Sequence, residues 1–144
     1  MTTENSLKLF IVLSKATKAI HEYQNKYIQQ AGLNPTEFAV LELLYHKGDQ
    51  PLQKIGSKIL IASGSITYVV DKLEQKEFVE RIACPNDRRV TFAHITESGK
   101  AFIDEIFPAH SERLDEIFSV ITEEEKQAAI TILKKVGISA RDKS

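Results

Sequence analysis

Apolar residues recur at spacings of three and four along most of the chain, a pattern that is typical of amphipathic helices. Over residues 7–31 this spacing predicts one long helix that Gly32 ends. The apolar face of this helix consists of Leu9, Leu13, Ala16, Ile20, Tyr23 and Tyr27.

The stretch "NPTEFAVLELLYHKG" predicts a second helix, in which Asn34 and Glu37 form a capping box, Pro35 takes the first helical position and Gly48 ends the helix. Asp49, Gln50 and Pro51 then open a short helix, "LQKIGSKIL", which has Ile55 and Ile59 on one face. After a turn of small residues, "SITYVVDKLEQKE" predicts another helix. Its core face consists of Ile66, Val69, Val70 and Leu73. Two short helices joined by such a turn are the outline of a helix-turn-helix.

The pattern then changes to alternation, which predicts strands. "FVERIA" and "RVTFAHI" alternate apolar and polar residues, and the turn-formers Pro85, Asn86 and Asp87 lie between them, so we expect a β-hairpin. Beyond the hairpin a helix is expected from Thr96 to about Val120, and Pro108 is expected to interrupt and kink it. A second capping box, Thr122 with Glu125, starts a final helix that Gly137 is expected to close.

This order predicts a mainly α fold with a small β-hairpin wing (α+β), namely a winged helix-turn-helix. We expect residues 1–144 to form a single domain, with residues 34–96 as the DNA-binding region. Residues 5–31 and 97–138 are expected to be dimerisation helices, because their apolar faces are too long for a small DNA-reading unit. A second copy of the chain is the simplest cover for them.

Composition narrows the class of protein. The net charge of −1 argues by itself for no charged partner, but residues 51–95 carry a net charge of +2 and residues 96–126 carry −6. If the partner is a polyanion, it should therefore meet the central segment. The one cysteine, Cys84, excludes an internal disulfide and suits a reducing compartment. Without a recognisable signal peptide or an apolar run of membrane-spanning length, we expect a soluble, cytoplasmic protein with no membrane contact.

The hairpin carries a family resemblance. Asp87-x-Arg89, five residues, Ile95-Thr96 and then Gly99 resemble the D-x-R-x5-L-T-x-x-G wing signature of the MarR family of bacterial transcription regulators, with Ile in place of Leu. "VVDKLEQKEFVER", "LNPTEFAVLELL" and "TEEEKQAAITILKKV" resemble other family segments in the same order. Within the family the chain looks closest to repressors that respond to catechols and quinones. The resemblance implies a homodimer on pseudo-palindromic double-stranded DNA, usually a repressor that a small, often phenolic, effector releases.

Three further positions depart from the family pattern. Glu77 stands where Gly commonly ends the recognition helix, and a positive φ there would strain Glu by about 1 kcal/mol. Tyr68 stands where a basic residue is common, so DNA contacts at this position should differ. Ala62 lies near the expected helix cap, which leaves Ser63 as the better cap.

Two groups of residues are candidates for DNA contact. On the recognition helix they are Ser63, Gly64, Ser65, Thr67, Tyr68 and Lys72, because short hydroxyls, a close backbone and one cation suit base edges and phosphates. On the wing, the resemblance makes Arg89 the residue that enters a minor groove, where negative potential attracts arginine. Asp87 can orient its guanidinium, and Arg88 is placed for a phosphate. The alternative is a capped helix and a solvated hairpin tip.

Other signals are weaker. Cys84 lies near two arginines and can act as an electrophile or redox sensor, or it is a small packed residue. Tyr23, Tyr27, Phe38 and Tyr45 can line a pocket for an aromatic effector, or they are plain core. The four histidines show no ligand spacing, so we expect no metal, no cofactor and no enzyme activity. A winged-helix module that binds protein instead of DNA remains the rival function.

Overall fold

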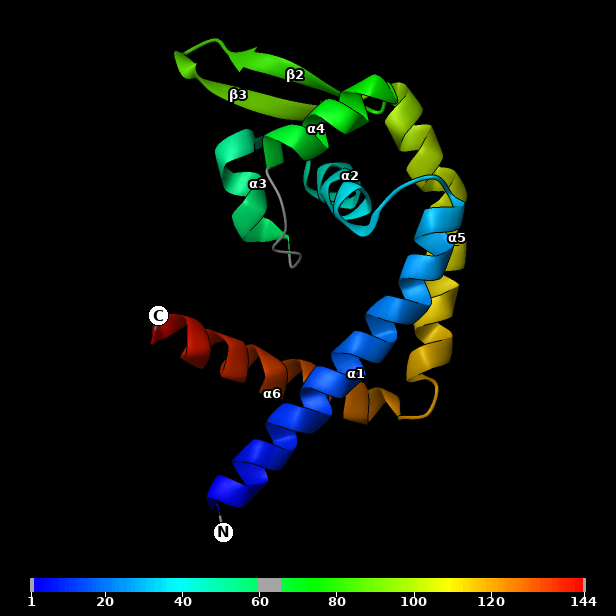
Figure 1. The fold of residues 1–144 in the computed structure, drawn as a ribbon, viewed down its shortest axis with the longest axis vertical. Coiled ribbons are helices and arrows are strands. Elements are labelled where there is room, and N and C mark those ends of the chain that lie inside the picture. The colour runs from blue at the N-terminus through cyan, green and yellow to red at the C-terminus, as the bar shows by residue number, and fades with distance from the viewer. Residues whose placement is uncertain (1, 60–65, 144) are drawn as a thin grey trace. The chain divides into compact units, whose positions relative to one another are not determined.

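The computed structural model of the protein describes residues 2–59 and 66–143 (Figure 1). The chain divides into two compact units, Met1–Pro108 and Ala109–Ser144. The described elements are α1 (Thr2–Gln30), α2 (Pro35–Lys47), β1 (Gln50–Pro51), α3 (Leu52–Lys58), α4 (Ile66–Gln75), β2 (Val79–Cys84), β3 (Asp87–Ile95), α5 (Glu97–Phe118) and α6 (Glu123–Asp142). The predicted winged helix-turn-helix, mainly α with a small wing, is therefore confirmed, whereas the prediction of a single domain stays a prediction.

The core of the first unit lies where α2, α3, α4 and the sheet meet. Its most deeply buried side chains are Val40, Leu41, Leu44, Ile55, Val70, Leu73, Ala93 and Ile103. The predicted inward face of the recognition helix is confirmed, because Val69, Val70 and Leu73 are buried and Ile66 packs against the core as a partly buried residue. Burying this face fixes which side of α4 remains available to solvent.

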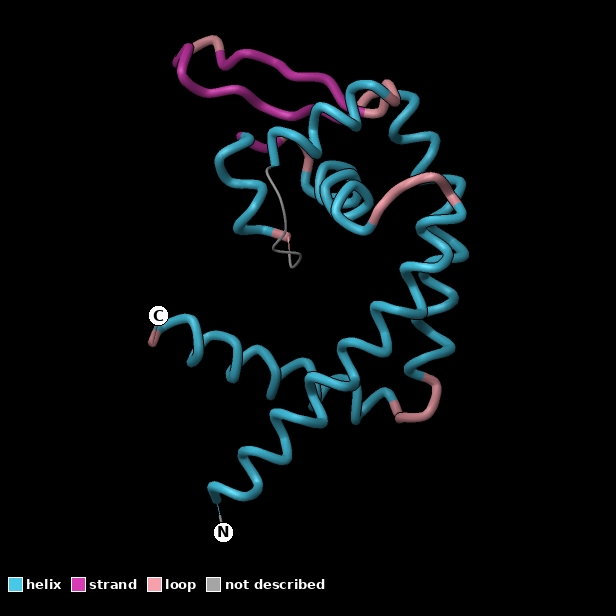
Figure 2. Tube along the Cα trace, in the orientation of Figure 1, coloured by secondary structure: helices cyan, strands magenta, loops and turns pink. Residues whose placement is uncertain are grey.

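The sheet has three strands in the order β1-β3-β2, all antiparallel (Figure 2). The hairpin pairs Val79 with Ile95 at its base, and its register shifts between Ala83 and Cys84 near the tip. Strand β1 corrects our expectation that Asp49, Gln50 and Pro51 open a helix, because Gln50 and Pro51 pair with β3 before α3 begins at Leu52. The sequence did not reveal β1 because a strand of two residues is too short to show an alternation of apolar and polar residues. Pro51 is compatible with β1 because β1 lies at the edge of the sheet, where proline is tolerated.

The predicted helix caps are present at α2 and α6. Asn34 and Glu37 form the reciprocal capping box of α2, and Thr122 and Glu125 form that of α6. The expectation that Gly137 closes the last helix is wrong, since α6 continues to Asp142. A glycine inside a helix costs only about 1 kcal/mol, which neighbouring helix formers offset.

The helix after the wing runs past Pro108 and has close to its expected extent, Thr96 to about Val120. α5 runs without a break in its assignment from Glu97 to Phe118, with Pro108 inside it. The expected interruption is therefore wrong.

Of the helices in the described part of the chain, none combines the length and the apolar character needed to cross a membrane.

Candidate DNA interface

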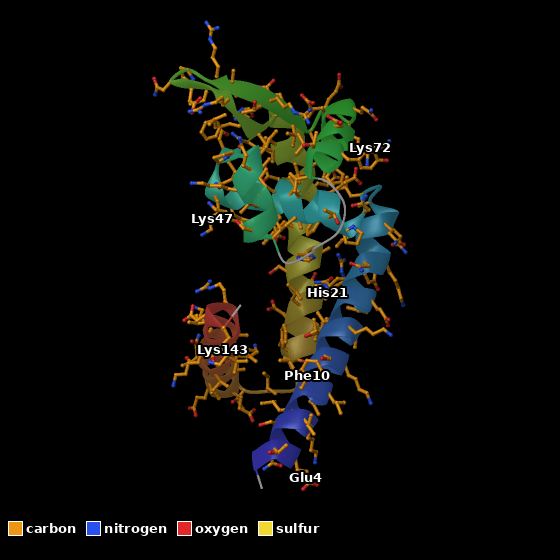
Figure 3. All side chains as sticks on the ribbon, turned by 60° about the vertical axis from the view of Figure 1, so that its left-hand side comes forward. Glu4, Phe10, His21, Lys47, Lys72 and Lys143 are labelled. Atoms are coloured by element: carbon orange, nitrogen blue, oxygen red, sulfur yellow. The ribbon has the colours of Figure 1, made fainter. Side chains whose placement is uncertain are left out.

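The outward face of α4 carries three of the six residues predicted on the recognition helix. Thr67 and Tyr68 are exposed, Tyr68 to 59%, and Lys72 is partly exposed. The Lys72 ammonium lies 5.2 Å from the centre of the Tyr68 ring, so the two side chains form a cation–π pair on this face; Figure 3 labels Lys72. The other three, Ser63, Gly64 and Ser65, lie outside the described residues.

The hairpin tip presents Arg89 to solvent, in contact with Asp87. Its side chain is 90% exposed, yet its Nε donates to Asp87 Oδ1 at 3.1 Å and its Nη2 donates to Asp87 Oδ2 at 3.3 Å. The backbone N–H of Arg89 also donates to Asp87 Oδ1, at 3.0 Å. The expected bidentate arrangement is therefore present. Arg88 beside it is exposed.

The hydrogen bonds from Arg89 also change the pKa of Asp87. The side-chain hydrogen bond from Arg89, followed by the backbone one, lowers the pKa of Asp87 below its ordinary value. Asp87 thus stays ionised over the whole neutral range and continues to orient the guanidinium.

The backbone of Arg89 is also held by α3. Gln53 of α3 donates from Nε2 to the Arg89 carbonyl at 3.3 Å, so the helix-turn-helix contacts the wing at this residue.

The base of the wing is joined to α5 by the Thr96–Gly99 segment of the wing signature. The Thr96 hydroxyl donates to the Glu77 carbonyl at 2.7 Å and accepts from the Gly99 N–H at 3.0 Å. A Cβ on Gly99 would lie 2.3 Å from the Phe78 carbonyl oxygen, so this position has no room for a side chain. Close packing against Phe78 therefore explains the glycine of the wing signature.

Two ionic contacts around α4 were not predicted from the sequence. Lys76, just beyond the end of α4, donates to both carboxylate oxygens of the buried Glu37, at 2.9 and 3.1 Å, and to the Gly32 carbonyl. Arg81 of β2 forms ion pairs with Asp71 and Glu74 of α4. Lys76 and Glu37 are 39 residues apart, and Arg81 lies on a different element from its partners. No local sequence pattern therefore predicts either contact.

Cys84 and His94 occupy other parts of the wing. Cys84 is partly buried at the end of β2, opposite Asp87. His94 Nδ1 lies 2.7 Å from Asp49 Oδ1, and its Nε2 lies 4.0 Å from Glu80 Oε1. Within the described residues, no group of three or more His, Cys, Asp or Glu side chains is arranged to hold a metal ion.

The candidate effector residues lie on α1 and α2. The rings of Tyr23 and Tyr27 meet edge to face with their centres 5.5 Å apart, and Phe38 is buried in the core. Tyr45 donates its hydroxyl to Asp104 of α5, and this hydrogen bond is the main cause that raises the pKa of Tyr45. Their role in binding an effector stays a prediction.

The sequence of the chain is similar to those of known transcription regulators. The model of the MarR family matches residues 33–91. The "HTH-type transcriptional regulator MhqR" of Bacillus subtilis (strain 168) is 64% identical over 139 residues, which cover 96% of each chain.

Solved structures with the same fold include two complexes. Sco3205, a MarR family transcriptional regulator from Streptomyces coelicolor crystallised with DNA, superimposes with a TM-score of 0.85 at 21% identity, over 97% of this chain and 93% of its own. NadR, crystallised with 4-hydroxyphenylacetate, superimposes with a TM-score of 0.76 at 25% identity, over 88% of this chain and 89% of its own.

Proposed function

Because this chain belongs to the MarR family and is a DNA-binding transcription regulator, we propose that it acts as a homodimeric repressor on a pseudo-palindromic operator. Each protomer places α4 in a major groove, with Thr67, Tyr68 and Lys72 toward the DNA. Each wing places Arg89 in the adjoining minor groove. The observation that carries this proposal is the exposed Arg89 guanidinium, held by Asp87 on the hairpin that packs beside α4 (Figure 1).

The chemistry of the two elements suits the two grooves. A major groove admits one α-helix, and the exposed face of α4 offers a hydroxyl, an aromatic ring and an ammonium to base edges and phosphates. A narrow minor groove attracts arginine, and an arginine that is already oriented loses less side-chain freedom when it binds. Arg88 then contacts the phosphate backbone.

Dimerisation is supported by exposed apolar side chains on both units. In the first half of α1 these residues are 50–68% exposed: Leu7, Leu9, Phe10, Ile11 and Val12. On α6 the corresponding exposed residues are Ile130, Ile132, Leu133, Val136 and Ile138. Helices with such faces are stable in water when another apolar surface covers them, and a second copy of the chain supplies that surface.

The proposed release signal is a small aromatic compound, phenolic or quinone-like. NadR binds 4-hydroxyphenylacetate in its crystal structure, and this chain has Tyr23 and Tyr27 in ring contact on α1. An effector acts by binding one arrangement of the recognition helices better than the arrangement that fits two successive major grooves.

The test is a salt titration of affinity for a duplex that the wild-type protein selects from a random pool. Counterion release predicts a steep fall in affinity as salt rises, and Arg89→Ala is expected to weaken binding at every salt concentration while circular dichroism stays unchanged. Arg141→Ala, at an exposed arginine of α6, is the matched control. A flat salt response would favour a winged-helix module that binds protein, and full-strength binding by Arg89→Ala would contradict the assignment of the wing to the minor groove.

A second candidate mechanism of release is covalent. Cys84 is partly buried next to the wing tip, so its modification by an electrophile would disturb the strand that supports Arg89. Cys84→Ser tests this route: release by a quinone that is the same in the variant and the wild type removes Cys84 as the sensor.

A further inference from the structure

Arg81 of β2 makes four contacts with α4. Its Nη2 lies 2.8 Å from Asp71 Oδ1 and donates to the Thr67 carbonyl at 3.2 Å. Its Nη1 donates to Glu74 Oε1, and its backbone N–H donates to Glu74 Oε2 at 3.3 Å. The side chain of Arg81 is 26% exposed, so a single wing residue is largely covered by the recognition helix.

These contacts follow one side of the helix. Thr67, Asp71 and Glu74 are spaced by four and three residues, so they lie in a row along α4, and the guanidinium spans that row. Asp71 and Glu74 remain partly exposed, at 50% and 35% of their side-chain surfaces. The carboxylates therefore border the same solvent that a docked duplex would displace.

The net negative charge of α4 makes the contacts of Arg81 relevant to DNA binding. Between Ile66 and Gln75 the helix contains two acids, Asp71 and Glu74, and one base, Lys72. Unpaired carboxylates on a helix that approaches phosphates would repel them, and the repulsion strengthens as water leaves the interface. Arg81 supplies the missing positive charge from the neighbouring strand.

We infer that Arg81 is a positioning residue for DNA binding: it neutralises Asp71 and Glu74 and holds them against β2, without contacting DNA itself. This inference rests on the proposed docking of α4 in the major groove. It goes beyond that docking, because it assigns a role to a residue on the inner side of the wing and explains how a helix with a net negative charge can approach a polyanion.

The test compares charge variants on the fluorescently labelled duplex that the wild-type protein selects from a random pool. Arg81→Gln is expected to weaken binding by about tenfold or more, because it leaves two carboxylates unpaired. The triple variant Asp71→Asn, Glu74→Gln, Arg81→Gln is expected to return to within about threefold of wild type, since the repelling charges are gone. Arg141→Gln on α6 is the matched loss of one arginine and should leave binding unchanged.

The salt dependence separates masking from direct contact. A residue that touches a phosphate contributes about 0.9 to the slope of log affinity against log salt concentration. The triple variant should therefore keep the slope of wild type, because it has no repelling carboxylates and, if Arg81 does not touch DNA, has lost no phosphate contact. A slope reduced by about one in the triple variant, or a triple variant as weak as Arg81→Gln, would overturn the inference.

The double variant Asp71→Asn, Glu74→Gln covers the case in which Arg81→Gln does not fold. It retains Arg81 and should bind at least as tightly as wild type; weaker binding would contradict charge masking. Failure of the α4 docking itself is recognised separately in the same assay, because Lys72→Ala, on the outward face of α4, would then bind at full strength.

Discussion

At the scale of single residues, Gly99 is the position where the wing signature is most tightly constrained by packing. A Cβ there would meet the Phe78 carbonyl oxygen at 2.3 Å and Ile95 Cγ1 at 2.7 Å. Gly99→Ala is therefore expected to lower the free energy of unfolding by about 1–3 kcal/mol, measured by urea denaturation.

Gly56 of α3 is the matched control, because a Cβ there meets Ile66 Cγ1 at an ordinary 3.6 Å. Gly56→Ala should raise the free energy of unfolding by about 0.5–1 kcal/mol, since alanine favours a helix. If both substitutions change stability alike, the close approach at Gly99 is not what restricts it.

Asp87 gives a second prediction at the residue scale. Its pKa is lowered by hydrogen bonds from Arg89, so its pairing stabilises the wing tip above the unfolded-state pKa of about 4 and is lost as pH falls through the lower folded-state pKa. A carboxyl NMR titration should find the Asp87 pKa below that of an ordinary exposed aspartate. In Arg89→Ala it should rise toward the ordinary value; an unchanged pKa would mean that the guanidinium does not hold the acid in solution.

At the scale of elements, α1 and α4 end in the same way with different residues. At α1 the N–H groups of Gly32 and Leu33 donate to the carbonyls of Gln29 and Ile28. At α4 the N–H groups of Glu77 and Phe78 donate to the carbonyls of Glu74 and Leu73. Both are Schellman motifs, in which the residue after the cap has a positive φ: 94° at Gly32 and 65° at Glu77.

The strain expected for Glu77 follows from this comparison. Glu77→Gly should raise the free energy of unfolding by about 0.5–1 kcal/mol, because glycine adopts a positive φ without a Cβ clash. Glu77→Ala keeps the Cβ and should give no such gain, and Gly32→Ala should lower stability by about 1 kcal/mol. Thermal or urea unfolding measures all three, and a gain in Glu77→Ala equal to that in Glu77→Gly would locate the effect in the carboxylate instead of the backbone.

The elements were predictable where their signal is local. The capping boxes at Asn34 and Thr122, the core face of α4 and the two long strands all follow from spacings within a few residues. The failures have physical reasons as well. β1 exists only because β3 offers it a partner, and α6 passes through Gly137 because one glycine costs less than the rest of the helix contributes.

In the candidate site too, contacts between residues close in sequence were predictable, and contacts between separate elements were not. The bidentate contact between Asp87 and Arg89 spans two residues and was visible in the sequence. The contacts of Arg81 with α4 and of Lys76 with Glu37 depend on how the elements pack, so the sequence alone named none of them as partners.

At the scale of the whole molecule, dimerisation is the proposal with the largest consequence. Phe10 is 68% exposed on α1 (Figure 3), so Phe10→Asp should leave the fold of a protomer intact and place a charge in the proposed apolar interface. Light scattering should then find a mass near the 16.2 kDa of one chain, against twice that mass for wild type, and affinity for DNA should fall with it.

His21→Asp introduces the same side chain at an exposed polar position of the same helix and should remain dimeric. A monomeric wild type, or a Phe10→Asp variant that stays dimeric and binds DNA normally, would contradict the proposed role of the α1 face.

The most direct test of the central claim is a footprint of the selected duplex, with hydroxyl radicals to report the minor groove and dimethyl sulfate to report the major groove. The wild-type protein should protect two symmetric half-sites about 10 bp apart, with minor-groove protection on the outer side of each. Arg89→Ala should lose the outer minor-groove protection and keep the major-groove protection at a protein concentration that saturates the site. Minor-groove protection that is absent in wild type, or identical in the variant, would contradict the account.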